Sequence, residues 1–328
     1  MSPDGSKIVL GGAHTPVNGS STPGYGLAAV DTTTGGLLPW ASNNLIRNGG
    51  EEANINSLAS DGTSVYGTGY VYGKGGNLEG TFKADWNGGE LQWVEDCHGD
   101  SYSVSPASDV VYTAGHAHYC GNVGGFPQTD PWSFYRAIAF TKATTGTLTA
   151  DPHGYYNFNG TPSPTLLDWF PTFNTGQASG ASQGPWDVLV AGKYVLYGGE
   201  FTTVNGVRQQ GLVRFATRDI APNDDGPRLN SADFVPNVVS YSRGTARIAW
   251  QANHDRDNAL LTYSVIRNSQ TANPVYTTTA SSNFYTRPIM SFTDTGLTPG
   301  ATYTYRIRVT DPFGNATLGT LVSVTISE

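Results

Sequence analysis

Six residues with metal-ligating or redox-active side chains lie within one short segment of the chain. They are Cys97, His98, Asp100, His116, His118 and Cys120. The segment between the cysteines has the pattern of a β-hairpin with its turn near residues 106–109, and residues equally far from a turn face each other. The two sulfurs are therefore placed to form a disulfide. A zinc site is the alternative, because all six residues, His98 included, carry possible ligand atoms. His116, His118 and Cys120 would also share one face of a continuing strand.

A second group of ligand atoms lies in the segment 253–258, where Asp255, Asp257 and Asn258 alternate with other polar residues. Carboxylates and amides at this spacing suit a hard cation such as Ca²⁺, the one cofactor that the sequence suggests. The alternative is a polar turn in which Arg256 pairs with a carboxylate.

Aromatic residues are concentrated in irregular segments of the first two thirds of the chain. Because aromatic rings beside Asn and Asp are the usual way to hold sugar rings, we consider five of them as ligand-binding residues. These are Trp132, Tyr135, Tyr155, Tyr156 and Trp169. The alternative is that these loops bury their own aromatic rings. Trp40 and Trp93 differ, since each ends a strand pattern, and we expect them to pack between repeats.

Catalytic motifs are not recognisable. No Gly-x-Ser-x-Gly sequence is present, and no phosphate-binding glycine loop follows a strand pattern. A glycosidase could draw two carboxylates from Asp85, Asp100, Asp187 or Glu200, but their spacing selects no pair. We therefore expect a protein that is not an enzyme.

The composition predicts an all-β protein. The chain has 328 residues with 41 Gly, 2 Met and 13% charged residues, a balance that suits short strands and turns better than helices. A net charge of −8 argues against nucleic acid as a partner, and no apolar run is long enough to span a membrane. Two cysteines suggest an oxidising compartment, so we expect a secreted or cell-surface protein.

The first two thirds of the chain contain a repeat. Four β-type runs end on glycine at positions 12, 69, 115 and 199. The last is followed by an Asn205-Gly206 turn, a strong hairpin signal. Repeats of about 40–50 residues with several strands are typical of β-propeller blades. Since Met1 leads directly into the first run, we expect the chain to begin inside a blade, and residues 151–185 to hold either a degenerate blade or an insertion.

The motifs of this region resemble a known family. SPDGSKIVLGG with LAAVDTTTGGLLPW, and GGEFTTVNGVRQQGLVRF, are similar to the delta-60-type, quinoprotein-like repeats of secreted actinobacterial β-propeller proteins. The resemblance covers most of residues 1–220 and implies a β-propeller of about five blades, incomplete if blades lie upstream. The quinone-binding residues of true quinoproteins are not recognisable, so the resemblance implies no dehydrogenase.

The last third of the chain predicts a different domain. We expect a β-propeller over residues 1–219, a linker over 220–229 and a seven-stranded sandwich over 230–328, whose last strand covers residues 318–326. Trp250, Tyr263 and the spacing of Leu297, Pro299 and Tyr303 resemble a fibronectin type III domain. In that immunoglobulin-like fold Tyr303 would form the tyrosine corner.

These patterns favour a non-enzymatic, secreted or cell-surface binding or scaffold protein whose partner is a polysaccharide or another extracellular protein. One alternative is a propeller enzyme acting on glycans, with the sandwich as an accessory domain. Another is a structural subunit that self-assembles outside the cell.

Overall fold

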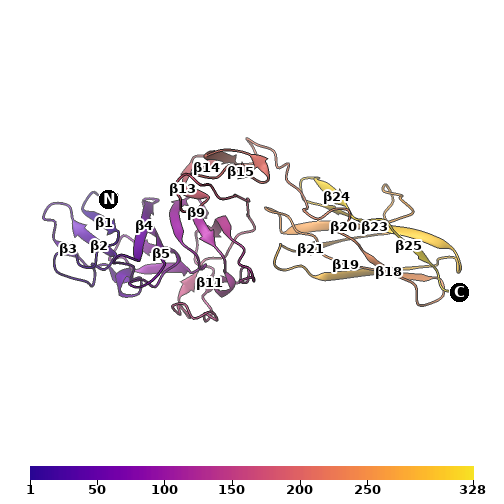
Figure 1. Cartoon of the computed structure of the whole chain (residues 1–328), viewed down its shortest axis with the longest axis horizontal. Coiled ribbons are helices and arrows are strands. Elements are labelled where there is room, and N and C mark those ends of the chain that lie inside the picture. The colour runs from indigo at the N-terminus through magenta and orange to yellow at the C-terminus, as the bar shows by residue number, and fades with distance from the viewer. The chain divides into compact units, whose positions relative to one another are not determined.

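A computed structural model describes all residues 1–328, and the chain is all-β (Figure 1). It divides into two compact units, Met1–Ala221 (the N-terminal unit) and Pro222–Glu328 (the C-terminal unit). Two single-turn 3₁₀ helices, Ala41–Asn44 and Gly121–Val123, are its only helical segments. Neither has the length or the apolar character needed to cross a membrane.

The N-terminal unit consists of antiparallel sheets that follow one another along the chain. The larger ones are β1–β2–β3 (Lys7–Gly11, Leu27–Asp31, Leu37–Leu38), β4–β5–β6–β7 (Ala53–Ser60, Ser64–Val71, Gly80–Asp85, Leu91–Glu95), β8–β9–β10 (Ser101–Pro106, Val110–Ala117, Tyr135–Thr141) and β13–β14–β17 (Pro185–Ala191, Tyr194–Gly199, Leu212–Ala216). Two small hairpins, β11–β12 (Gly146–Thr147, Pro162–Ser163) and β15–β16 (Thr203–Val204, Val207–Arg208), complete the unit. The four glycine-ended runs of the repeat form β1, β5, β9 and β14, so their prediction as strands is confirmed.

Neighbouring sheets contact each other through their first strands. Strands β4 and β5 contact β8, and β8 in turn contacts β13. The structure shows no closed ring or barrel. It therefore establishes a series of antiparallel sheets and does not establish the expected β-propeller of about five blades.

The sheets of this unit are held together by apolar clusters between them. Trp93 is fully buried, and its Nε1–H donates to the main-chain oxygen of Lys142, 3.1 Å away, beyond the end of β10. Trp40 is also buried and its ring lies edge-on to Trp86, at 6.2 Å between centroids, in the turn between β6 and β7. The prediction that Trp40 and Trp93 pack between repeats is therefore confirmed. Close packing also explains a glycine: a Cβ on Gly67 would lie 2.5 Å from the Phe82 ring.

The Asn205-Gly206 turn is present but joins different strands from those expected. Both residues have positive φ, 52° and 78°, as a tight hairpin turn requires. The turn closes the short hairpin β15–β16, which is inserted between β14 and its partner β17. The two longer apolar runs therefore pair with each other across the inserted hairpin.

The C-terminal unit consists of two antiparallel sheets. One is β18–β19–β22 (Asn237–Val239, Thr245–Gln251, Ile289–Thr295). The other is β21–β20–β23 (Tyr276–Ser281, Leu260–Arg267, Thr302–Thr310), with β24 (Ala316–Leu318) and β25 (Val322–Thr325) both paired to β23. The strand expected over residues 318–326 is therefore divided, and each part extends a different half of β23.

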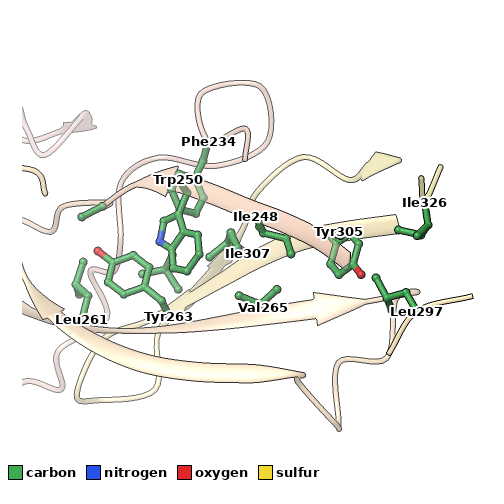
Figure 2. Packing of buried hydrophobic residues seen from close by; sticks show 13 residues of the cluster. Phe234, Ile248, Trp250, Leu261, Tyr263, Val265, Leu297, Tyr305, Ile307 and Ile326 are labelled. Carbon is green, nitrogen blue, oxygen red and sulfur yellow. The ribbon is translucent and has the colours of Figure 1, made fainter. Parts of the chain in front are cut away.

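Both sheets of the C-terminal unit contribute to one core. Figure 2 shows Trp250 from β19, Tyr263 from β20 and Tyr305 from β23 among its side chains. Along β23 the buried side chains alternate with half-buried arginines, because successive residues of a strand point to opposite faces. The main-chain N–H of Thr298 donates to Tyr303 Oη at 3.2 Å, which confirms the predicted contact of the tyrosine corner.

Candidate functional site

The hairpin β8–β9 brings the two cysteines together. They lie just beyond its paired ends, both are buried, and they form a disulfide with 4.3 Å between the Cα atoms of Cys97 and Cys120. The disulfide predicted from the hairpin pattern is therefore present in the structure. Because both sulfurs are engaged, they are not available as thiolate ligands of a metal.

The histidines of this segment have separate environments. Both ring nitrogens of His116 are engaged: Nδ1 lies 2.9 Å from the Tyr102 hydroxyl, and Nε2 accepts from the Asp100 N–H at 3.3 Å. The His118 ring stacks on Trp132, 4.0 Å between centroids. No group of three or more His, Cys, Asp or Glu side chains in the chain is arranged to hold a metal ion.

His98 connects the disulfide segment to the loop that begins at Asp151. The side chain is fully buried, and its Nε2 lies 2.9 Å from Asp151 Oδ2 and 3.5 Å from Asp96 Oδ2. Its ring stacks on Tyr155, with 3.9 Å between centroids. These contacts fix the position of the loop at residues 151–156 against the end of β7.

Beside this contact lies an open pocket of about 430 Å³. The glycine-rich connection between β5 and β6, the residue that follows β7 and the loop at 154–156 form its walls. Among the lining side chains are three tyrosines, one amide and two carboxyls: Tyr72, Tyr155, Tyr156, Asn77, Glu79 and Asp96. Tyr72 and Tyr156 are 67% and 47% exposed, so their rings are accessible to a ligand.

The carboxyls of the pocket are in an unusual electrostatic environment. Burial raises the pKa of Glu79 to about 7, although its Oε2 accepts a hydrogen bond of 3.0 Å from the Gly99 N–H. Burial also raises the pKa of Asp96, whose carboxylate accepts from Asn122 Nδ2 at 3.2 Å. Near neutral pH the Glu79 carboxyl can therefore both donate and accept a proton.

Of the five aromatic residues predicted to bind a ligand, the pocket contains Tyr155 and Tyr156. Trp132 is 48% exposed and covers His118, and Tyr135 packs on Phe126 at 4.2 Å between centroids. Trp169 lies in a separate groove of about 580 Å³, between the sheets that contain β9 and β14.

The carboxylates of the pocket are not those considered from the sequence. Asp85, Asp100, Asp187 and Glu200 are not among its lining residues. Asp187 accepts from the Ser103 hydroxyl at 2.5 Å, and Glu200 accepts from the N–H and hydroxyl of Ser179. Glu79 and Asp96 were missed because neither belongs to a recognisable motif. The glycine-rich loop at 73–76, directly after a strand with two tyrosines, was the available signal.

The loop at residues 253–258 lies in the C-terminal unit, between β19 and β20. Arg256 Nη1 donates to Asp225 Oδ2 at 2.7 Å, which is the kind of ion pair expected for a polar turn. Asp257 accepts from Asn258 Nδ2 at 2.6 Å, and Asp255 lies buried beside it.

No protein-family model matches the chain, and no curated protein matches it either. Several solved structures are similar to parts of it. The sixth fibronectin type III domain of human fibronectin type III domain containing protein 3 is 17% identical over 33% of this chain and 93% of its own, with a TM-score of 0.25.

The PKD domain of an M14-like peptidase from Thermoplasmatales archaeon SCGC AB-540-F20 is also 17% identical, over 32% of this chain and 100% of its own, with a TM-score of 0.23. The FN1–FN3 domains of chicken CNTN1 are 10% identical over 84% of this chain and 98% of their own, with a TM-score of 0.22.

Proposed function

We propose that the protein is an extracellular binding protein and that the pocket beside Tyr72 and Tyr156 holds a carbohydrate. The observation that carries this proposal is the combination of accessible tyrosine rings with polar side chains, among them the buried Asp96, in one open pocket. The C–H faces of a sugar stack on aromatic rings, and its hydroxyls need hydrogen-bond partners such as Asn77, Glu79 and Asp96. The disulfide supports an oxidising, extracellular location.

The arrangement of the pocket also suits a binding site that is formed before the ligand arrives. Tyr155 is fixed by its stack on buried His98, and the hydroxyl of Tyr72 donates to the Glu51 main-chain oxygen at 2.7 Å. Side chains that are already held in place lose little conformational freedom on binding, which favours affinity.

A glycan array probed with the full chain tests this proposal, followed by titration of the best ligand. Tyr72→Ala and Tyr156→Ala should each weaken binding by about threefold to tenfold, the usual effect of removing one aromatic contact. Tyr241→Ala is the matched control, since Tyr241 is 84% exposed and lies in the C-terminal unit. Failure of every glycan to bind, or equal loss in the control, would contradict the proposal.

A second candidate function is cleavage of the bound glycan, and the raised pKa of Glu79 specifically favours it. A protonated Glu79 would give its proton to the glycosidic oxygen as the bond to the anomeric carbon breaks. The Asp96 carboxylate, as general base, would take a proton from the water whose oxygen adds to that carbon. Chromogenic glycosides test it: turnover that Glu79→Gln abolishes establishes an enzyme, and binding without turnover supports the binding protein.

The arrangement of the chain into a propeller, a linker and a sandwich is part of the same proposal. We infer that residues 1–219 form part of a β-propeller, which is joined through residues 220–229 to a fibronectin type III-like sandwich over residues 230–328. The consecutive meandering sheets and the alignment of β1, β5, β9 and β14 support the propeller. A crystal structure of the protein that shows a closed ring of blades would establish it, and sheets that pack in another way would exclude it.

A further inference from the structure

One end of the C-terminal unit gathers polar side chains from three segments that are far apart in sequence. The first is residues 223–225, the second is the β19–β20 loop at 253–258, and the third is the turn after β23. Asn315 Nδ2 donates to the main-chain oxygens of Asn223 and Asp225, at 3.0 and 2.9 Å, and to Asp311 Oδ2 at 2.8 Å. Asn223 in turn donates to Asp257 Oδ2 at 2.8 Å, so the three segments form one connected network.

Within this network one carboxylate oxygen has no partner. Asp255 is only 1% exposed, and its Oδ1 accepts the main-chain N–H of Arg256 at 2.6 Å. Its Oδ2 is buried and has no hydrogen-bond partner. A buried carboxylate oxygen without a donor or cation is costly, and such oxygens are rare in folded proteins.

The neighbouring group makes this arrangement still less favourable. The side chains of Asp255 and Asp257 lie within hydrogen-bonding reach of each other, although both are acids. Two carboxylates this close require a proton or a cation between them.

The nearby arginines do not supply that cation. Arg256 Nη1 lies 2.7 Å from Asp225 Oδ2, and Arg228 Nη1 lies 2.9 Å from Asp225 Oδ1. Asp225 therefore pairs with both guanidinium groups, and the Asp255–Asp257 pair has no basic side chain of its own. The ion pair of Arg256 is thus compatible with a cation at the adjacent carboxylates.

We propose that Asp255 and Asp257 bind a calcium ion, with amide oxygens from Asn223 and Asn258 as further ligands. Both amides now donate to Asp257, at 2.8 and 2.6 Å, and rotation of each by half a turn would present an oxygen from the same place. Calcium takes six to eight oxygen ligands and accepts main-chain oxygens and water among them. Because the site has only two carboxylates, we expect a dissociation constant of about 10⁻⁴–10⁻³ M, the range of extracellular calcium modules.

Titration of the full chain with calcium chloride, followed by calorimetry, tests the site. One ion per chain should bind in that range, and the melting temperature of the C-terminal unit should rise in millimolar calcium. Asp255→Asn and Asp257→Asn should each weaken binding at least tenfold. Asp224→Asn is the matched control, because it makes the same change of charge in the adjacent segment at an exposed residue and should leave binding unchanged. Absence of binding, or equal loss in the control, would overturn the proposal.

A second measurement separates a cation site from a purely structural carboxylate pair. In calcium-free buffer Asp255→Asn removes the like-charge contact, so the variant should melt at the same temperature as the original protein or above it. In millimolar calcium the variant should instead melt at a lower temperature than the original protein. A variant that is destabilised equally in both buffers would show that the carboxylates serve the fold alone, and an equal shift with sodium chloride at matched ionic strength would show general screening; either result would overturn the proposal.

Discussion

The two units of the chain bury their side chains in different ways. The C-terminal unit has one continuous apolar core between two sheets, and its buried Asp294 is matched by Arg267 and by the Tyr305 hydroxyl, at 2.9 and 2.8 Å. The N-terminal unit has several separate clusters between small sheets. Next to them it buries Glu95, Asp96 and His98, along with a disulfide.

This difference indicates which residues are candidates for function. An apolar core is stable without any ligand, whereas buried ionisable groups cost free energy unless they are paired or used. In the N-terminal unit these groups lie beside an open pocket with accessible tyrosines. In the C-terminal unit the comparable exception is Asp255, away from the core. Three experiments test the comparison.

The largest effect is expected from the single core of the C-terminal unit. Trp250 is 3% exposed and packs against Tyr263, with 6.2 Å between ring centroids. Trp250→Ala should lower the free energy of unfolding of this unit by about 3–5 kcal/mol, because the lost contacts leave a cavity. Differential scanning calorimetry of the full chain should show its transition move down while that of the N-terminal unit stays. An equal shift of both transitions would show that the two units do not unfold independently.

A smaller effect is expected from the disulfide, and it should be confined to the N-terminal unit. Cys97 and Cys120 are 23 residues apart, and closing a loop of this size removes chain entropy from the unfolded state worth about 3 kcal/mol. The double variant Cys97→Ala, Cys120→Ala should lose about that much stability in urea denaturation, and a reducing agent should then have no further effect. If reduction of the original protein left the pocket's ligand affinity and stability unchanged, the disulfide would not support this region.

The smallest effect is a pH dependence that comes from the buried carboxyls of the N-terminal unit. Burial raises the pKa of Glu95 from its ordinary 4.5 to about 8, so between these values the folded protein holds a proton that the unfolded chain releases. Stability from Glu95 is therefore lost as pH rises, by up to about 1.4 kcal/mol per pH unit. Burial lowers the pKa of His118 to about 4, which makes stability rise with pH, but only up to the ordinary histidine value of 6.5.

Above pH 6.5 the carboxyl effect should therefore dominate, and the urea midpoint of the N-terminal unit should fall between pH 6.5 and 8. Glu95→Gln should flatten this slope, because an amide does not titrate. A slope that Glu95→Gln leaves unchanged would show that Glu95 is not the titrating group.

Local sequence patterns correctly predicted those features that depend on the backbone preferences of a few neighbouring residues. The glycine-ended runs formed strands, and the Asn205-Gly206 dipeptide formed a tight turn, because both depend on local backbone preferences. The connection between two paired strands was harder to predict. Strands β14 and β17 pair as their two apolar runs suggest, but the Asn205-Gly206 turn closes a short hairpin inserted between them. The division of the last strand at Gly319 and Thr320 was also missed, because it depends on which part of β23 each half can reach.

The sequence by itself determined the all-β class, the alternation that places Tyr305 in a core, and the meeting of Cys97 with Cys120. These follow from strand period and from hairpin symmetry, which act at short range. Only the tertiary structure brought Glu79, Asp96 and Tyr156 to one pocket, and Asn223 to Asp257, because these residues come from separate loops. Their pKa values and partners depend on burial, which is a property of the assembled fold and of no single segment.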